Sequence, residues 1–342
     1  MSNINQTKSP RVPEELKVLF GEVNVGKYCK RHSVTPEEFQ TIRCQVIERN
    51  KVLPKNGLDM LNELKARDSR RLSIGYANID ELLGGGLQPG DITEISGEST
   101  TGKTRLCYSA LLSITCLNKE NTALFIDTKN GSCANYIRTL FLESDQFADA
   151  RERGMDVDSI SDRIHIQKGC VYEDDLLNVI EDLNLQFQQK EINNFYLNLK
   201  LIVIDSISSV FSPLLGYNID HYPYSRITIF IRTLRNLAKK YNITILITNS
   251  VQYARPYDHK SVFSINKKPA LGQTWTYLTD TTLFLSLGDD SDQRVYINRQ
   301  GCEILGVPRI CEVLRSRKNL VVGRYCTFYM GYTEFFPEFA AI

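Results

Sequence analysis

The sequence has almost no net charge, few histidines and no long apolar run. Its 342 residues include 41 Lys and Arg against 40 Asp and Glu, for a formal net charge of +1. This excludes a protein that coats nucleic acid through overall positive charge, so any such contact needs a local basic patch. The four histidines form no visible triad with a Ser or Cys nucleophile, which argues against hydrolases of that kind. Because the first residues are polar and no apolar run reaches about 18 residues, we expect no signal peptide and no membrane span.

Cysteine pairs at metal-binding spacing are also missing. The nine cysteines include no C-x-x-C pair and no Cys/His cluster with zinc spacing. Several lie inside apolar runs, where cysteine behaves as a small hydrophobic residue. We therefore expect reduced thiols, as in cytosolic or nuclear proteins. Since 42% of the residues are hydrophobic, the chain has enough apolar side chains for a sizeable core, and global disorder is excluded.

The sequence does contain a complete phosphate-binding loop. It matches G-x-x-x-x-G-K-S/T and consists of Gly97, Glu98, Ser99, Thr100, Thr101, Gly102, Lys103 and Thr104. In such a loop the backbone N–H groups surround phosphates, the lysine reaches the β- and γ-phosphates, and the last hydroxyl ligates Mg²⁺. The apolar stretch 91–96 predicts a strand before the loop. Residues 105–112 predict a helix whose N-terminus faces the anion.

The order of elements indicates an α/β core that follows a small helical domain. Residues 1–50 form the predicted helical domain, in which Thr35–Glu38 is a capping box at the start of a helix. Residues 51–71 are a polar linker around a short helix. In 72–342, apolar strands alternate with amphipathic helices, which is typical of a mostly parallel sheet. We predict strands at 123–127, 164–167, 199–205, 243–248 and 282–287, helices near 104–118, 173–190 and 225–241, and antiparallel edge strands that include 295–298 and 325–329.

Acidic and polar side chains are expected beside the phosphate loop. The strand 199–205 ends in Asp205, which it would deliver to the carboxyl edge of the sheet as a second magnesium element. Asp127 and 248–250 end two further predicted strands. In ATPases of this topology such strand ends hold the groups that activate water and sense the γ-phosphate. The alternative is that they are ordinary polar residues where strands reach solvent.

A basic and aromatic loop follows the strand 243–248. Residues 252–268 carry one acid, Asp258, against the cations Arg255, Lys260, Lys267 and Lys268, with Tyr253, Tyr257 and Phe263 among them. Cations for phosphates and aromatic rings for bases are the side chains that bind single-stranded DNA. The alternative is a solvated surface loop. A second loop, 213–224, has three tyrosines but no net positive charge and makes a weaker candidate.

Several stretches resemble the RecA/RadA recombinase family, and within it the eukaryotic recombinase paralogues that mediate homologous recombination, the D type above all. These stretches are 72–87, 91–97, the phosphate loop, 203–206, 212–216, 247–249 and 268–275. The resemblance implies a RecA-like P-loop core, ATP and Mg²⁺ as cofactors, and a nuclear location. It places ATP phosphates on the phosphate loop, Mg²⁺ at Thr104 and Asp205, and Tyr136 against the adenine. The loops 213–224 and 252–268 would face DNA.

The sequence departs from active recombinases at three places. Lys129 stands where they have a glutamate that orients the attacking water, and Ser250 stands at the γ-phosphate-sensing glutamine. The linker lacks their Phe-x-x-Ala anchor. A lysine cannot act as a carboxylate base. The resemblance therefore implies a non-filamenting adaptor that hydrolyses ATP weakly and binds other paralogue subunits, the main recombinase and, within a complex, single-stranded DNA.

Two other functions stay open. Lys103 and Asp205 favour a DNA-dependent ATPase that performs strand exchange, whereas Lys129 and Ser250 argue against it. A P-loop kinase or transporter-associated ATPase is favoured by the phosphate loop alone. The absence of a lid-arginine cluster and the stretch around Trp275 argue against that third class.

Overall fold

The chain divides between Lys65 and Ala66 into two compact units. The computed structural model describes residues 25–49, 56–68, 71–131, 134–189, 193–215, 222–255, 258, 261–264, 266–289, 291–297, 301, 303–318 and 320–337. In the first unit, α2 (Val25–His32) precedes α3 (Pro36–Arg49), and α4 (Gly57–Asp68) crosses the division. The predicted capping box at the start of α3 is confirmed. The Thr35 N–H donates to Glu38 Oε2 at 2.7 Å, and the Glu38 N–H donates to Thr35 Oγ1 at 3.2 Å.

The second unit is built on a mixed sheet, to which the described residues contribute ten strands in the order β12-β11-β10-β8-β1-β5-β4-β2-β3, with β9 paired to β10. The parallel strands are β8 (Thr281–Leu287), β1 (Ile92–Gly97), β5 (Thr244–Asn249), β4 (Leu199–Asp205), β2 (Thr122–Asp127) and β3 (Ile164–Lys168). The antiparallel strands at one edge are β9 (Arg294–Ile297), β10 (Glu303–Ser316), β11 (Tyr325–Met330) and β12 (Phe335–Pro337). The prediction of a mostly parallel sheet with an antiparallel edge is confirmed.

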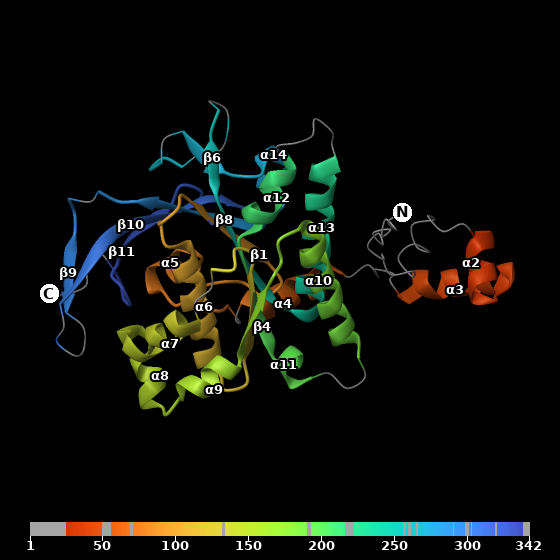
Figure 1. Cartoon of the computed structure of the whole chain (residues 1–342), viewed down its shortest axis with the longest axis horizontal. Helices are drawn as coiled ribbons and strands as arrows, with labels where there is room; N and C mark the ends of the chain where they lie inside the picture. The colour runs from red at the N-terminus through yellow and green to blue at the C-terminus, as the bar shows by residue number, and fades with distance from the viewer. Residues whose placement is uncertain are drawn as a thin grey trace, which may run out of the picture. The chain divides into compact units, whose positions relative to one another are not determined.

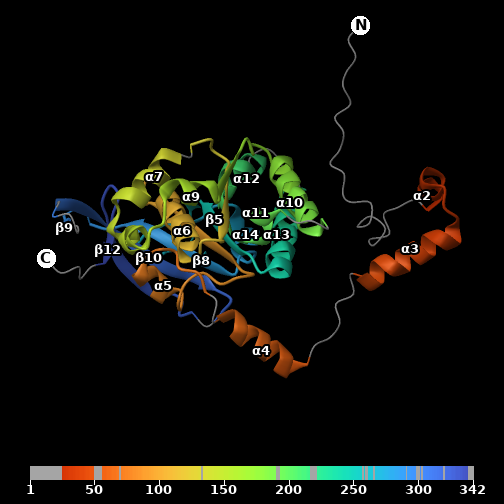
Figure 2. The same cartoon turned by 90° about the horizontal axis from the view of Figure 1, so that it is seen from below.

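Helices cover both faces of this sheet (Figures 1 and 2). The first core contains side chains from α5 (Ala77–Leu82), α6 (Lys103–Leu117), α7 (Ala134–Glu143), the 3₁₀ turn Asp145–Phe147, α8 (Ala148–Glu152) and α9 (Val157–Asp162). The second contains side chains from α10 (Glu173–Gln188), α11 (Asn194–Leu197), α12 (Ile207–Leu215), α13 (Tyr222–Tyr241) and α14 (Gly272–Thr276). In β4, Leu201 belongs to the first core and Ile202 to the second, because successive strand residues point to opposite faces. Both faces of the sheet are therefore largely apolar.

The two loops expected to face DNA differ from their predicted bounds. α12 continues to Leu215 and α13 begins at Tyr222, so the ends of the 213–224 loop are helical. The 252–268 segment begins and ends in a small antiparallel hairpin of β6 (Val251–Tyr253) and β7 (Lys267–Pro269). Periodicity did not predict these strands because each is only three residues long. In the described part of the chain, no helix is both long and apolar enough to cross a membrane.

Candidate functional site

The phosphate loop joins the end of β1 to the start of α6, as the sequence predicts. The Lys103 ammonium donates to the carbonyl oxygens of Gly97 at 2.7 Å and Glu98 at 2.6 Å. Two glycines are required by this geometry. Gly102 has φ of 99° and a Cβ there would overlap the Met330 side chain, while a Cβ on Gly97 would lie 2.5 Å from the Leu285 carbonyl oxygen.

The lysine of this loop has an unusual pKa. The pKa of Lys103 is lowered from 10.5 to about 8, mainly by burial and secondly by the nearby Lys129 ammonium. Asp205 and Glu98 act in the opposite direction but do not offset the burial. An ammonium that is costly to keep charged in the free protein would be stabilised by a polyanionic ligand. The loop therefore has the electrostatic character of a phosphate site.

A hydroxyl and a carboxylate meet beside the loop. β1, β5, β4 and β2 are neighbouring parallel strands, so their carboxyl ends share one edge. Thr104 Oγ1 donates to Asp205 Oδ2 and Thr248 Oγ1 donates to Asp205 Oδ1, both at 2.5 Å. Among the described residues, no group of three or more His, Cys, Asp or Glu side chains could hold a metal ion. Thr104 and Asp205 are suitable oxygen donors for Mg²⁺ that takes its other ligands from phosphates and water.

Lys129 lies at the same edge. Its ammonium is 3.7 Å from Asp205 Oδ1, and its backbone N–H donates to Asp127 Oδ1 at 3.0 Å. Asp127 and Asp205 are directly opposite in the β2–β4 pairing, and both are buried. The position expected to carry a glutamate thus presents a cation to the proposed magnesium carboxylate. This group cannot accept a proton from water while it is charged, but it adds positive charge beside the phosphate loop.

Residues at the end of β5 are hydrogen-bonded to neighbouring elements. The Ser250 N–H donates to Ser208 Oγ at 3.0 Å. The neighbouring Asn249 is buried and donates to Glu94 Oε1 at 2.8 Å.

Glu94, a fully buried residue of β1, was not singled out from the sequence. It accepts hydrogen bonds from Trp275 Nε1 at 2.7 Å and Thr282 Oγ1 at 2.9 Å, as well as from Asn249. These partners come from α14, β8 and β5, so the carboxylate ties the phosphate-loop strand to the elements around it. The available signal was an acid in the middle of the strand predicted at 91–96, because a buried carboxylate needs several donors.

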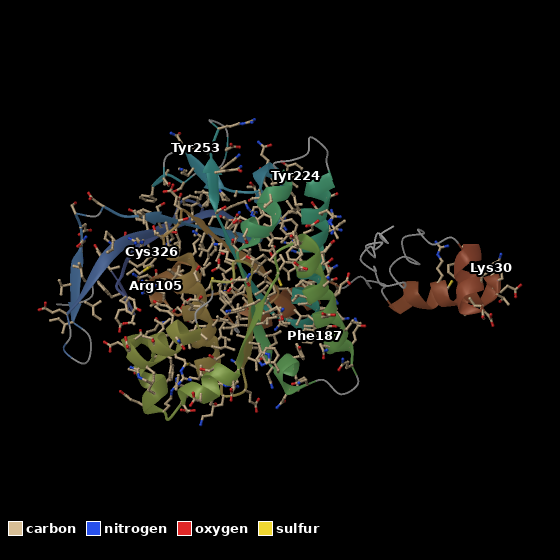
Figure 3. The ribbon with its side chains drawn as sticks, in the orientation of Figure 1. Lys30, Arg105, Phe187, Tyr224, Tyr253 and Cys326 are labelled. Atoms are coloured by element: carbon tan, nitrogen blue, oxygen red, sulfur yellow. The ribbon has the colours of Figure 1, made fainter. Side chains whose placement is uncertain are left out.

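Tyr136 lies on α7 beside the N-terminal end of α6. Its hydroxyl donates to the Tyr332 carbonyl oxygen at 2.8 Å, and the Arg105 guanidinium lies 5.7 Å from its ring centre. Arg105 is marked in Figure 3 and donates to the same carbonyl. Tyr136 thus lies against the first turn of α6, directly after the phosphate loop. Met330 and Tyr332 lie over the phosphate loop and Tyr136. The sequence did not predict these contacts, because Met330 and Tyr332 are more than 190 positions after the residues that they contact.

The side chains expected to contact DNA are only partly free to do so. Tyr253 is 79% exposed at the end of β6 (Figure 3), and Arg255 is exposed. In contrast, Lys267 is 3.1 Å from Glu98 Oε1 and Lys268 is 2.6 Å from Asp258 Oδ2. Two of the predicted DNA cations are therefore neutralised within the protein. Tyr257 and Lys260 lie outside the described residues.

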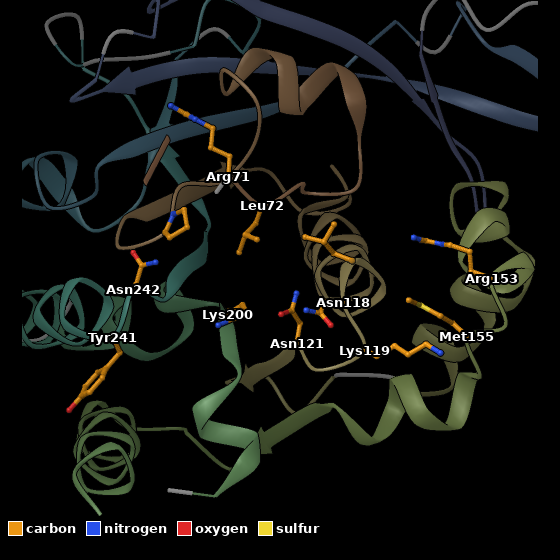
Figure 4. Close-up of a pocket in the computed structure, with 12 residues that line it drawn as sticks. Arg71, Leu72, Asn118, Lys119, Asn121, Arg153, Met155, Lys200, Tyr241 and Asn242 are labelled. Carbon is orange, nitrogen blue, oxygen red and sulfur yellow. The ribbon is translucent and has the colours of Figure 1, made fainter. Parts of the chain in front are cut away.

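A large cavity lies away from this edge. It has a volume of about 870 Å³ and is lined by the end of α6 at Leu117, by Asn121, and by basic residues that include Lys119, Arg153 and Lys200 (Figure 4). The phosphate loop is at the opposite end of α6. No residue of the predicted site lines this cavity.

The fold and the loop together define a P-loop protein with a RecA-like α/β core. A sequence model of the family described as Rad51 matches residues 66–313, which is more than half of the chain, and the chain belongs to the Rad51 family. The chain is 29% identical over 245 residues to the "DNA repair protein RAD51 homolog 4" of Bos taurus, covering 71% of this chain and 69% of that protein. It is 26% identical over 247 residues to the Mus musculus protein of the same name, covering 72% and 69%. It is also 28% identical over 248 residues to the "DNA repair and recombination protein RadA" of Ignicoccus hospitalis, covering 65% and 68%. The resemblance drawn from the sequence is confirmed.

Proposed function

We propose that this chain is a nuclear, ATP-binding mediator of homologous-recombination repair. In this role it joins other recombinase paralogue subunits and helps to load the main recombinase on single-stranded DNA. Membership of the Rad51 family and the similarity to proteins named for DNA repair and recombination support this process. The phosphate loop would hold the ATP phosphates, and Thr104 with Asp205 would hold Mg²⁺. The magnesium ion would neutralise the negative charge of the phosphates and help to hold the phosphate end of the bound nucleotide.

The position of Lys129 carries the proposal that hydrolysis is weak. Its ammonium is 3.7 Å from Asp205 Oδ1, where a water-orienting carboxylate would be needed. General acid–base catalysis contributes about 10²–10⁴-fold to the rate of a reaction. ATP would then act mainly by ordering the segments around the phosphate loop, which requires binding but no cleavage. The second candidate, a DNA-dependent ATPase that performs strand exchange, is favoured by Lys103 and by the contact between Thr104 and Asp205.

The deciding experiment measures ATP binding and ATP turnover by the purified chain, each with and without single-stranded DNA. We expect binding with negligible turnover that DNA does not stimulate, and no filaments in ATP by electron microscopy. Lys103→Ala is the negative control for binding, because it removes the phosphate cation. Robust DNA-stimulated turnover would instead support the strand-exchange ATPase.

Two substitutions at one position test the role of Lys129. Lys129→Glu supplies the missing carboxylate and should raise turnover by about tenfold, below the full effect of a general base because Ser250 still replaces the sensing glutamine. Lys129→Met removes the cation without adding a carboxylate and should not raise turnover. Equal turnover in the two variants would show that the carboxylate position does not limit hydrolysis.

A further inference from the structure

We propose that the ion pair between Glu98 and Lys267 couples nucleotide binding to the β6–β7 hairpin. The inference rests on the proposed binding of ATP at the phosphate loop, and it assigns a route by which that site reaches the 252–268 segment. Lys267 acts here as a positioning residue, since it contacts the phosphate loop and not the reacting atoms.

The pair joins two segments that are far apart in the sequence. Glu98 is the second residue of the phosphate loop, and its Oε1 lies 3.1 Å from Lys267 Nζ on β7. The two side chains are 42% and 26% exposed, so the contact is partly shielded from solvent. The backbone of Glu98 makes a second contact, because its carbonyl oxygen accepts a hydrogen bond from the Lys103 ammonium at 2.6 Å. One residue is therefore in contact both with the phosphate lysine and with the hairpin.

From Lys267 the contacts continue across the hairpin. Its ammonium lies 4.5 Å from the ring centre of Tyr253, its partner in the β6–β7 pairing. Beyond that pair, the Ala254 N–H donates to the Asn266 carbonyl oxygen at 2.7 Å. Tyr253 is 79% exposed, so this chain of contacts ends at an aromatic side chain that is open to a base.

The physical consequence follows from linkage. A ligand that fixes the phosphate loop also fixes the Glu98 carboxylate, and this favours the hairpin conformation that keeps Lys267 beside it. A partly exposed ion pair supports only a modest effect, about twofold to fivefold in an equilibrium constant. By reciprocity, a ligand that orders the hairpin would raise nucleotide affinity by the same factor. The pair would thus provide coupling in a chain whose sensing position holds Ser250.

A second ion pair among the described residues of the hairpin is local. Lys268 pairs with Asp258, and both residues belong to the 252–268 segment. This pair has no partner in the phosphate loop and cannot transmit a change from it. At the opposite end of β1, Lys318 pairs with Asp91, which precedes the strand. Lys318 therefore provides a matched control: a lysine–carboxylate pair at the other end of β1, remote from the hairpin.

Amide hydrogen exchange of the full chain tests this coupling without DNA. Exchange is followed at the hairpin amides of Ala254 and Ala270, which donate to Asn266 and Ser250, with and without saturating Mg²⁺ and a slowly hydrolysed ATP analogue. In the wild type, the analogue should slow both amides by about threefold. Lys267→Met should abolish this slowing, whereas Lys267→Arg and Lys318→Met should retain it. Each variant is compared at its own saturating nucleotide concentration, and a thermal melt verifies that it is folded.

The outcomes separate the coupling from the proposed function. If the wild type does not bind the nucleotide in a parallel titration, the proposed function fails and the coupling fails with it. If the wild type binds but its hairpin amides do not slow, the coupling alone is overturned. Full slowing in Lys267→Met would also overturn it, because the hairpin would then respond without the pair.

Discussion

Raising the pH through about 8 should weaken ATP binding, because the phosphate-loop lysine then loses its charge. Burial is the main reason that the pKa of Lys103 falls from 10.5 to about 8, and the Lys129 ammonium is the second. The lysine is charged below this pKa and neutral above it. Phosphate groups have a second pKa near 6, so above about pH 7 the charge of the nucleotide stays nearly constant. The pH dependence in this window would therefore report on the protein.

The size of the effect follows from the fraction of charged lysine. About nine-tenths of Lys103 side chains are protonated at about pH 7 and about one-tenth at about pH 9, for a pKa of about 8. If only the charged form binds the phosphates, the dissociation constant should rise about tenfold across this range. Bound phosphate should in turn raise the pKa of the lysine, so binding near pH 8 should take up a proton.

Titration of a fluorescent ATP analogue between pH 7 and 9 measures this dependence, and calorimetry in two buffers of different ionisation enthalpy measures the proton uptake. Lys103→Arg should give a flat profile, because a guanidinium stays charged. Lys129→Met should move the midpoint to higher pH without restoring the ordinary value, since burial remains. A flat wild-type profile would refute the reasoning and would mean that the Lys103 charge is not needed, or that its pKa is ordinary.

Other predictions concern the frame of the site. Trp275→Phe removes a donor to the buried Glu94 carboxylate and should lower the free energy of unfolding by about 1.5–3 kcal/mol in urea denaturation. Ordinary surface substitutions change the free energy of unfolding by less than roughly 0.5 kcal/mol, and a loss this small would contradict the importance of this hydrogen bond. Gly102→Ala forces a side chain into a left-handed backbone conformation and against Met330, so it should weaken ATP binding. The added change Met330→Ala should recover only the part that is due to overlap, and full recovery would show that the backbone strain is unimportant.

Much of the fold could be predicted because its signals are local. The strand that ends at Asp205 contains the continuous apolar run 201–204, as expected of a strand buried on both faces, and its observed bounds are those predicted. The helix after the phosphate loop was likewise predicted from the residues that directly follow the loop. β6 and β7 were missed because three-residue strands have no measurable periodicity. The start of α13 at Tyr222 was placed too late, since Pro223 lies in its first turn, where proline is tolerated.

The candidate site likewise has a part that could be predicted from local sequence and a part that could not. Lys103, Thr104 and Asp205 follow from a motif and a strand end, so the sequence alone brings them together. The hydrogen bonds of Glu94 and the ion pair of Glu98 with Lys267 depend on tertiary contacts between distant segments. A sequence read residue by residue shows the charge of each group but not its partner. For this reason Lys267 was predicted to contact DNA, whereas the structure pairs it with the phosphate loop.

The cover over the phosphate loop has a consequence for the synthesis of the protein. Arg105 and Tyr136 take Tyr332 as their partner, and Arg105 is 227 positions before it. At about 5–20 residues per second, a ribosome needs roughly 10–45 s to make the intervening chain. The phosphate motif is therefore complete well before the segment that closes over it emerges. A chain terminated before β11 would keep the whole Gly97–Thr104 sequence and still lack one wall of the site. The same product would retain the entire 66–313 family match.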